Sequence, residues 1–93
     1  MRKVVIDFTD MKTLGQLHLE MKGKLSFPDF YGENLDALWD CLTGFIGGKN
    51  IINVSFLGFH TLDEDILEYA MRILETFTEA EEGYGDIRVL GFE

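Results

Sequence analysis

Cysteine and proline each occur only once in the 93 residues, and no long hydrophobic run is present. With Cys41 as its one cysteine, the chain cannot close an internal disulfide, which is typical of proteins in a reducing compartment. No apolar run approaches the roughly 20 residues that a membrane-spanning helix needs. The opening apolar run, Val4 to Ile6, meets Asp7 at once and is too short for the core of a signal peptide. We therefore expect a cytoplasmic protein.

Basic residues are scarce. Lys and Arg together number 8 against 17 Asp and Glu, which gives a formal net charge of -9. Nucleic-acid binding needs clustered Lys and Arg to neutralise phosphates, so we expect no nucleic-acid partner. An acidic membrane surface would repel the chain, so we expect no membrane partner either. A basic protein, in contrast, would be attracted to it.

Motifs of common catalytic sites are also missing. The sequence contains no HExxH, GxSxG, phosphate-binding loop or dinucleotide-binding glycine fingerprint. His18 and His60 are far apart, without the spacing of metal ligands, and we interpret them as ordinary core or surface residues. Cys41 falls towards the core side of its helix, which favours a buried, inert thiol over a nucleophile. We expect no catalytic residue, no metal ligand and no cofactor.

The residues that are present suffice for one folded domain spanning 1–93. Apolar residues make up 46% of the chain and aromatic residues 13%, so a core can form without disulfides or metals. Apolar runs and helical periodicity predict an alternation of strands and helices. The expected strands are Val4–Phe8, Ile51–Leu57 and Ile87–Leu90, and the expected helices cover roughly 14–22, 35–43 and 63–82.

This order predicts an α/β fold in which a three-stranded parallel sheet is joined by right-handed crossovers. The strand Ile51–Leu57 is apolar on both faces near its ends, which is typical of a parallel sheet covered by helices.

Polar and glycine residues predict where the helices begin and end. Thr13 is the expected N-cap of the first helix and Asn34 that of the second. The last helix should begin at Thr61 or Asp63. Gly23 is expected to help end the first helix. The second should break at the glycines that follow it, which are Gly44, Gly47 and Gly48.

The second helix carries an unusual acidic face. Its apolar positions Leu35, Leu38, Leu42 and Ile46 fall on one side and should face the core. Asp36, Asp40 and Gly44 fall roughly opposite, with Trp39 at the boundary. The two aspartates repel each other at i,i+4 spacing, and no Lys or Arg lies three or four residues from either. This face is either a solvated surface or, with a large ring and a small glycine beside unpaired acids, a contact surface.

Acids also line the exposed side of the last helix. Its core stripe is formed by Ile66, Ala70, Ile73 and Phe77. Opposite that stripe lie Glu68, Glu75 and Glu79. Arg72 can pair with Glu68 or Glu75, whereas Glu79 is out of its reach along the helix.

The run from Tyr31 to Gly44, YGENLDALWDCLTG, strongly resembles the most characteristic segment of the barstar family, intracellular inhibitors of the bacterial ribonuclease barnase. A looser resemblance covers the whole chain and includes Leu14–His18 and Asp86–Leu90. It implies a parallel three-stranded sheet packed with three to four helices. It also implies inhibition by direct occlusion of the active site of the nuclease.

The resemblance assigns contact roles to matching positions. Asp40 matches the acid that enters the phosphate-binding pocket of the nuclease, and Asp36 matches an acid that pairs with basic groups at the rim of the cleft. By a looser alignment, Glu79 matches a third acid on the last helix. Further contact positions of the family are matched by Asn34, Trp39, Thr43 and Gly44.

Several positions depart from the family pattern. Phe30 stands where the family has a contacting tyrosine, so the ring is kept and the hydroxyl is lost. Phe45 stands in place of a tryptophan, and both remain in the predicted partner-binding set. The loop around Gly47 and Gly48 differs. These departures bear on which nuclease is bound more than on the mode of binding.

The sequence thus predicts a 1:1 complex with a small, basic, extracellular-type ribonuclease, formed by a chain that is monomeric when free. The alternative is an acidic adaptor that binds another basic protein and need not use Asp40. A third interpretation makes Asp36 and Asp40 an acid–base or metal-binding pair, but no catalytic motif accompanies them.

Overall fold

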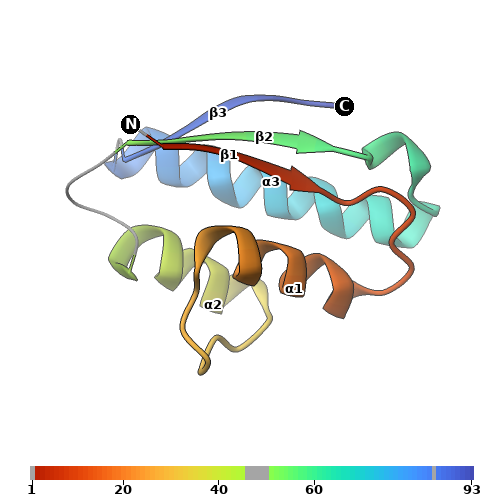
Figure 1. Cartoon of the computed structure of the whole chain (residues 1–93), viewed down its shortest axis with the longest axis horizontal. Helices are drawn as coiled ribbons and strands as arrows, with labels where there is room; N and C mark the ends of the chain where they lie inside the picture. The colour runs from red at the N-terminus through yellow and green to blue at the C-terminus, as the bar shows by residue number, and fades with distance from the viewer. Residues whose placement is uncertain (1, 46–50, 85) are drawn as a thin grey trace.

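The structure, a computed structural model, describes residues 2–45, 51–84 and 86–93. Three strands and three α-helices form one α/β unit (Figure 1). In chain order the elements are β1 (Arg2–Asp7), α1 (Leu14–Leu25), α2 (Leu35–Asp40), the π-helix η1 (Cys41–Phe45), β2 (Ile52–Leu57), the 3₁₀ turn η2 (Phe59–Thr61), α3 (Glu64–Tyr84) and β3 (Ile87–Phe92).

The sheet confirms the predicted topology. β2 lies in the centre and pairs in parallel with both β1 and β3. Val54 in β2 is opposite Val4 in β1 and Val89 in β3. The register between β2 and β3 then shifts, because Ser55 is opposite Gly91, which leaves Leu90 as an extra residue in β3.

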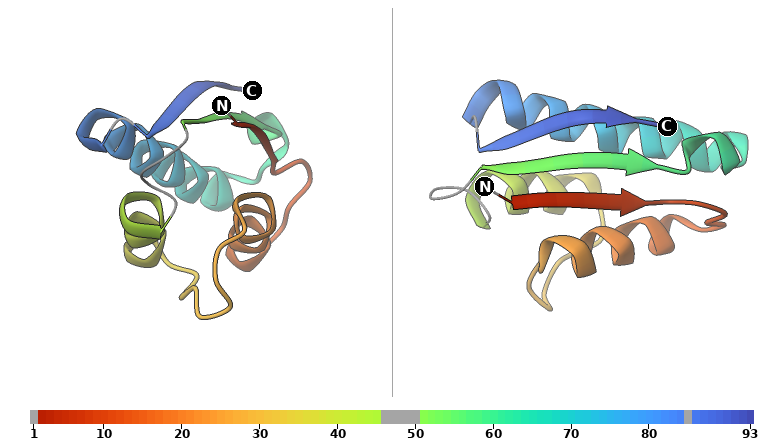
Figure 2. Two further views of the ribbon diagram at one scale, coloured as in Figure 1. Left: turned by 60° about the vertical axis from the view of Figure 1, so that its left-hand side comes forward. Right: turned by 45° about the horizontal axis from the view of Figure 1, so that its top comes forward.

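The helices cover only one face of this sheet. Figures 1 and 2 show α1, α2 and α3 on the same side of the three strands. On the other face Lys3, Val5 and Asp7 of β1 are exposed. The expectation of a sheet covered by helices is therefore correct for one face and wrong for the other. Polar side chains at alternate positions of β1 allow the outer face to remain in contact with water.

The core lies between the covered face of the sheet and the helices. The predicted stripe of α3 is largely confirmed, since Ala70, Ile73 and Phe77 are fully buried, whereas Ile66 is half-buried. The ring of Phe56, from the central strand, lies 5.1 Å from that of Phe77 between ring centroids and 6.0 Å from that of Phe8. Phe56 thus joins α3 to the sheet.

α1 begins as predicted but ends later. Thr13 and Gln16 form a capping box, in which the Thr13 side chain accepts from the Gln16 backbone and the Gln16 side chain accepts from the Thr13 backbone. The helix runs through Gly23 to Leu25, so the expectation that Gly23 helps to end it was wrong. Gly23 lies on the exposed side, and burial of Leu25 stabilises the turn beyond it. Ser26, in a left-handed conformation, ends the helix instead.

The second helical segment also continues past its predicted break. α2 passes directly into η1, which includes Gly44 and ends at Phe45. Gly44 therefore does not end the helical backbone. The wider π-type turn places Cys41 and Leu42 in the core at adjacent positions. Ile46, Gly47 and Gly48 lie outside the described residues.

α3 starts after Asp63, because the Leu67 N–H donates to the Asp63 carbonyl at 2.8 Å. This confirms one of the two predicted starts. The other, Thr61, belongs to η2, and its hydroxyl donates to the Gly58 carbonyl at 2.6 Å. α3 extends to Tyr84, slightly beyond the predicted end and through Gly83. None of the helices in the described part of the chain is both long and apolar enough to cross a membrane.

Helix side chains close both edges of the sheet. At the β1 edge, the Lys24 ammonium donates to the Val5 carbonyl at 3.0 Å, and the Asp7 N–H donates to the Glu20 carboxylate at 2.9 Å. At the β3 edge, the Val89 N–H donates to the Glu81 carboxylate at 2.8 Å. Since unpaired edge groups invite pairing with another strand, these contacts protect the sheet from association at its edges.

Gly58 connects β2 to η2 at a point where no side chain fits. Its φ is +90°, and a Cβ built on it would lie 2.3 Å from the backbone nitrogen of Thr9. Because both the backbone conformation and the contact oppose a side chain, we expect Gly58→Ala to lower the free energy of unfolding by about 2–4 kcal/mol. Urea unfolding should show this loss. Gly23→Ala, an exposed helical site with open space around it, is the control and should be neutral or stabilising.

Candidate functional site

The acids of α2 are exposed and form no ion pair with another described residue. Asp36 and Asp40 both lie on the solvent side of the helix. In the described residues, the ion pairs join Lys22 to Asp29 and Lys24 to Glu20, and neither includes an acid of α2. The two carboxylates, one helical turn apart, therefore present uncompensated negative charge.

The helix that carries these acids is fixed at its start and along its inner side. The Asn34 side-chain oxygen accepts from the Ala37 N–H at 2.8 Å, which confirms the predicted N-cap. Leu38 and Leu42 are fully buried, as predicted, and Leu35 is half-buried. The Asn34 side-chain nitrogen donates to the Gly32 carbonyl at 3.3 Å, so both ends of the Asn34 amide are bonded to backbone.

Cys41 is buried behind Asp40. Burial raises the pKa of the Cys41 thiol, and the negative charge of Asp40 raises it further. A thiol with a raised pKa is a poor nucleophile at neutral pH. The structure therefore bears out the interpretation of Cys41 as a buried core residue.

The helical pattern placed Trp39 at the boundary between the core side and the exposed side of the helix, and the structure agrees. Trp39 is half-buried and packs against the core. The Trp39 carbonyl accepts from the Thr43 hydroxyl at 2.8 Å, so Thr43, also half-buried, turns back onto the helix. Gly44 is exposed with open space around its Cα. The side chain of Phe45 lies outside what the structure describes.

The exposed aromatic ring of this region is Phe30. With 85% of its surface exposed, it stands out of the loop that joins α1 to α2. Next to it, Tyr31 is buried, and its ring lies 4.8 Å from that of Phe27. Glu33, also exposed, takes a left-handed backbone conformation. Sequence reasoning did not select Glu33 as a site residue, although it lies in the characteristic run beside the cap.

Glu79 lies on α3 and is exposed, as predicted. α3 packs against both α2 and η1, and its carboxyl-terminal half lies at the same end of the molecule as the end of α2 (Figures 1 and 2).

Arg72 forms no ion pair with a described residue, so the expected pairing with Glu68 or Glu75 is absent. The side chains of Glu68, Arg72, Glu75 and Glu79 are all exposed to solvent.

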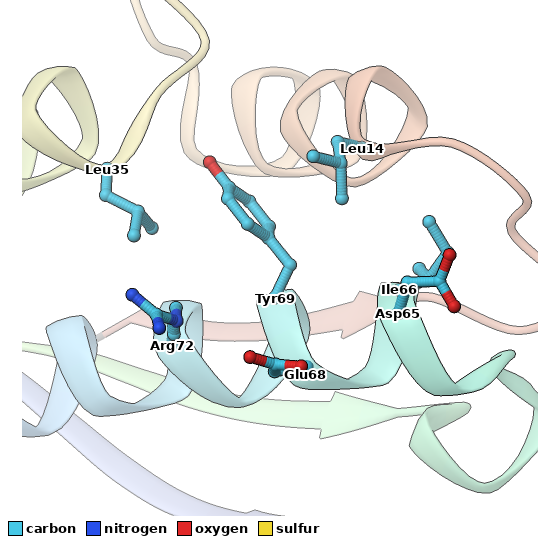
Figure 3. Close-up of a pocket in the computed structure, with 7 residues that line it drawn as sticks. All are labelled: Leu14, Leu35, Asp65, Ile66, Glu68, Tyr69 and Arg72. Atoms are coloured by element: carbon cyan, nitrogen blue, oxygen red, sulfur yellow. The ribbon is translucent and has the colours of Figure 1, made fainter.

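A groove of about 440 Å³ opens near the start of α2, between α1 and α3 (Figure 3). Its walls are formed by Leu14, Leu35, Asp65, Ile66, Glu68, Tyr69 and Arg72. None of the predicted site residues lines it. The predicted residues that are exposed, which are Phe30, Asn34, Asp36, Asp40, Gly44 and Glu79, lie on helix and loop surface outside the groove. This arrangement suits contact with a macromolecule.

Two comparisons agree with this fold. A family model described as Barstar (barnase inhibitor) matches residues 1–90. The Bacillus subtilis (strain 168) protein named "Putative ribonuclease inhibitor YrdF" is 42% identical to the chain over 86 residues, which make up 92% of each protein. The family model extends from β1 into β3 and covers all of α2, including Asp36 and Asp40. The chain therefore belongs to the barstar family of barnase inhibitors.

Proposed function

We propose that this protein inhibits a barnase-like ribonuclease by placing carboxylates of α2 where the enzyme binds the phosphates of RNA. The observation that carries the proposal is that Asp36 and Asp40 are exposed on a capped helix whose inner side is buried, and that neither forms an ion pair within residues 2–45, 51–84 and 86–93. A helix held in this way offers two negative charges at a fixed separation. Binding would then require little reorganisation of the inhibitor.

The chemistry of the target explains why carboxylates suit this role. A ribonuclease has to hold a phosphate and its developing charge, and it does so with Arg, Lys and His side chains in a cleft. A carboxylate that enters the cleft accepts charge-assisted hydrogen bonds from these groups, including bidentate bonds from Arg. Asp40 is assigned the phosphate pocket and Asp36 the rim. Phe30, Asn34, Trp39, Thr43, Gly44, Phe45 and Glu79 complete the proposed contact set.

The remaining parts of the proposal concern where and how the protein acts. The partner is a small, basic, extracellular-type ribonuclease that is bound one to one inside the cytoplasm by a monomeric inhibitor. The net charge of -9 supports a basic partner. The chain has no catalytic role in this account.

Charge should act on the rate of association as well as on the final contacts. We expect Asp36→Ala and Glu79→Ala to weaken binding less than Asp40→Ala, with about a two- to tenfold slower association rate, because long-range attraction steers the two proteins together. Raising the salt concentration should reduce the difference in association rate between wild type and these variants, since screening shortens the range of the attraction. Stopped-flow association at several salt concentrations measures both effects.

Two results would contradict this ordering. One is an equal and small loss for all three alanine variants in a binding titration. The other is an association rate that does not change with salt. Lys12→Ala, which removes an exposed positive charge outside the proposed surface, is the opposite-sign control and should leave association unchanged or slightly faster.

The function itself is tested by mixing the purified protein with small basic secreted ribonucleases, including one from the same organism. We expect RNA cleavage to fall linearly with added protein and to stop near equal amounts of the two. No loss of cleavage with any of these enzymes would favour the adaptor that binds another basic protein. A third outcome is that the protein alone catalyses RNA cleavage or a metal-dependent reaction that Asp36→Ala abolishes. That result would favour the interpretation of Asp36 and Asp40 as an acid–base or metal-binding pair.

A further inference from the structure

A buried histidine joins the loop between α1 and α2 to the rest of the molecule. His18 lies in α1 with only 1% of its surface exposed. Its Nδ1 lies 2.6 Å from the Tyr31 hydroxyl and its Nε2 lies 2.8 Å from the Tyr69 hydroxyl. The three residues come from α1, from the loop and from α3, so two hydrogen bonds hold three separate segments together. Figure 3 shows the Tyr69 hydroxyl pointing away from α3 towards the other two segments.

The loop depends on this contact for its position. We call residues 26–34 the interface loop, because they carry the exposed Phe30 and end at the helix cap Asn34. Its buried side chains are Phe27 and Tyr31, whose rings contact each other. Asn34 follows Tyr31 by only three positions, so movement of Tyr31 would shift both the ring of Phe30 and the start of α2.

We propose that His18, as a neutral imidazole, is the positioning residue of the interface loop and makes closure of that loop dependent on pH. A neutral imidazole has one nitrogen that donates and one that accepts, so it bonds two hydroxyls at once. An imidazolium can only donate, so the tyrosine that donates to it loses its acceptor. The added charge would also be buried among aromatic rings.

The groups around His18 do not offset that cost. Burial lowers the pKa of His18, and the negative charge of Glu33 only partly opposes this effect. Burial raises the pKa of Tyr31 and of Tyr69, so both hydroxyls stay protonated at neutral and acidic pH. The other titratable or charged groups that act on these tyrosines, or line the groove beside Tyr69, are Cys41 in η1 and Asp65, Glu68 and Arg72 in α3.

The direction of the pH effect follows from these shifts. When the loop opens, His18 meets water and takes up a proton below its ordinary pKa of about 6.5. In the closed state it does so only at lower pH. The opened state therefore binds more protons over this interval, and the opening constant should rise by up to about tenfold for each pH unit below 6.5. Above that pH His18 is neutral in both states, so opening should no longer change with pH through this residue.

Free protein provides the first test, which does not depend on any nuclease. The chain has two histidines, so His60, which is exposed, is a matched control. NMR titration should give His18 a pKa below its ordinary value of about 6.5. Exchange of the Tyr31 amide, which donates to the Pro28 carbonyl at 3.0 Å, should reveal a loop opening that rises in acid after correction for intrinsic rates. The rise should persist in His60→Gln and disappear in His18→Gln, whose amide can bond both hydroxyls without titrating.

A second variant guards against misfolding of His18→Gln. Tyr31→Phe keeps the ring and removes the hydroxyl, so the loop should open about five- to tenfold more often at pH 7.5. An ordinary pKa for His18, identical pH profiles of loop opening for wild type and His18→Gln, or no change in loop opening in Tyr31→Phe would each overturn the proposal.

The consequence for binding rests on the proposed function. If only the closed loop binds, the dissociation constant is proportional to one plus the opening constant. The ratio of the dissociation constants of wild type and His18→Gln for a ribonuclease should therefore rise between pH 7.5 and 5.5 by the factor that the opening constants from amide exchange give, with about tenfold as the upper limit. Taking this ratio cancels the titration of the enzyme itself. A ratio that departs from this factor would overturn the link between the loop and binding. If wild type binds no tested ribonuclease at pH 7.5, the proposed function fails, and the exchange profiles still decide the role of His18.

Discussion

Asp40→Ala should cause the largest loss of ribonuclease binding of any single substitution in this chain. In the proposed complex, the Asp40 carboxylate enters the phosphate-binding pocket of the nuclease. There it is surrounded by Arg and His side chains and shielded from water. Removing one partner of such a charge pair leaves the opposite charges buried and unpaired, which typically costs about 2–5 kcal/mol. The dissociation constant should therefore increase by a factor of about thirty to several thousand, mostly through faster dissociation. Surface plasmon resonance with an immobilised ribonuclease measures both rates.

The substitution should leave the fold intact. Asp40 is exposed and forms no ion pair in the described part of the chain, and its removal relieves the repulsion from Asp36. The unfolding midpoint should be unchanged or slightly higher. Glu93→Ala removes the same charge at the end of β3 and is the matched control. A similar loss of affinity in the two variants would mean that net charge, and not the position of Asp40, determines binding.

Phe56→Ala should cause one of the largest losses of stability. Phe56 is fully buried in the central strand, and its ring lies 5.1–6.0 Å between centroids from those of Phe8, Phe59 and Phe77. Truncation removes a large apolar side chain and leaves a cavity between the sheet and α3, at an expected cost of about 3–5 kcal/mol. A domain of this size is typically stable by about 5–15 kcal/mol. Urea unfolding should therefore show a midpoint far below that of wild type.

A second phenylalanine serves as the control for this experiment. Phe30 is 85% exposed, so Phe30→Ala should change the free energy of unfolding by less than about 0.5 kcal/mol. The two variants are expected to separate stability from binding. Phe56→Ala should bind the ribonuclease with near wild-type affinity at temperatures where it is still folded. Equal stability losses for the two variants would contradict the described packing of the core.

Local patterns predicted the elements of the fold more reliably than their ends. Thr13 and Asn34 were recognised as caps because capping depends on a few neighbouring residues. The ends of the helices depend on tertiary packing, which no local pattern contains. Gly23 and Gly44 are poor helix formers, yet the burial of Leu25 and Leu42 beside them stabilises helical backbone at both sites. The uncovered face of the sheet also depends on where whole helices pack.

The candidate site shows the same distinction. The exposure of Asp36, Asp40 and Glu79 follows from helical phase alone, and the structure agrees with it. Trp39 lies at the boundary of the helix faces by phase, and its half-burial agrees with that position. How far it packs against the core depends on neighbouring elements, which helical phase does not show. The role of His18 could not be derived from sequence, since its partners Tyr31 and Tyr69 lie 13 and 51 residues away.

The most direct test of phosphate mimicry is competition between this protein and a bound nucleotide. A ribonuclease mixed with increasing amounts of a non-cleavable oligonucleotide should bind the wild-type protein more and more slowly. The association rate should fall in proportion to the fraction of active sites that the oligonucleotide fills. An oligonucleotide that lacks phosphates should have no such effect. Formation of a stable three-component complex, with the oligonucleotide and the protein bound to the same enzyme molecule, would contradict the account.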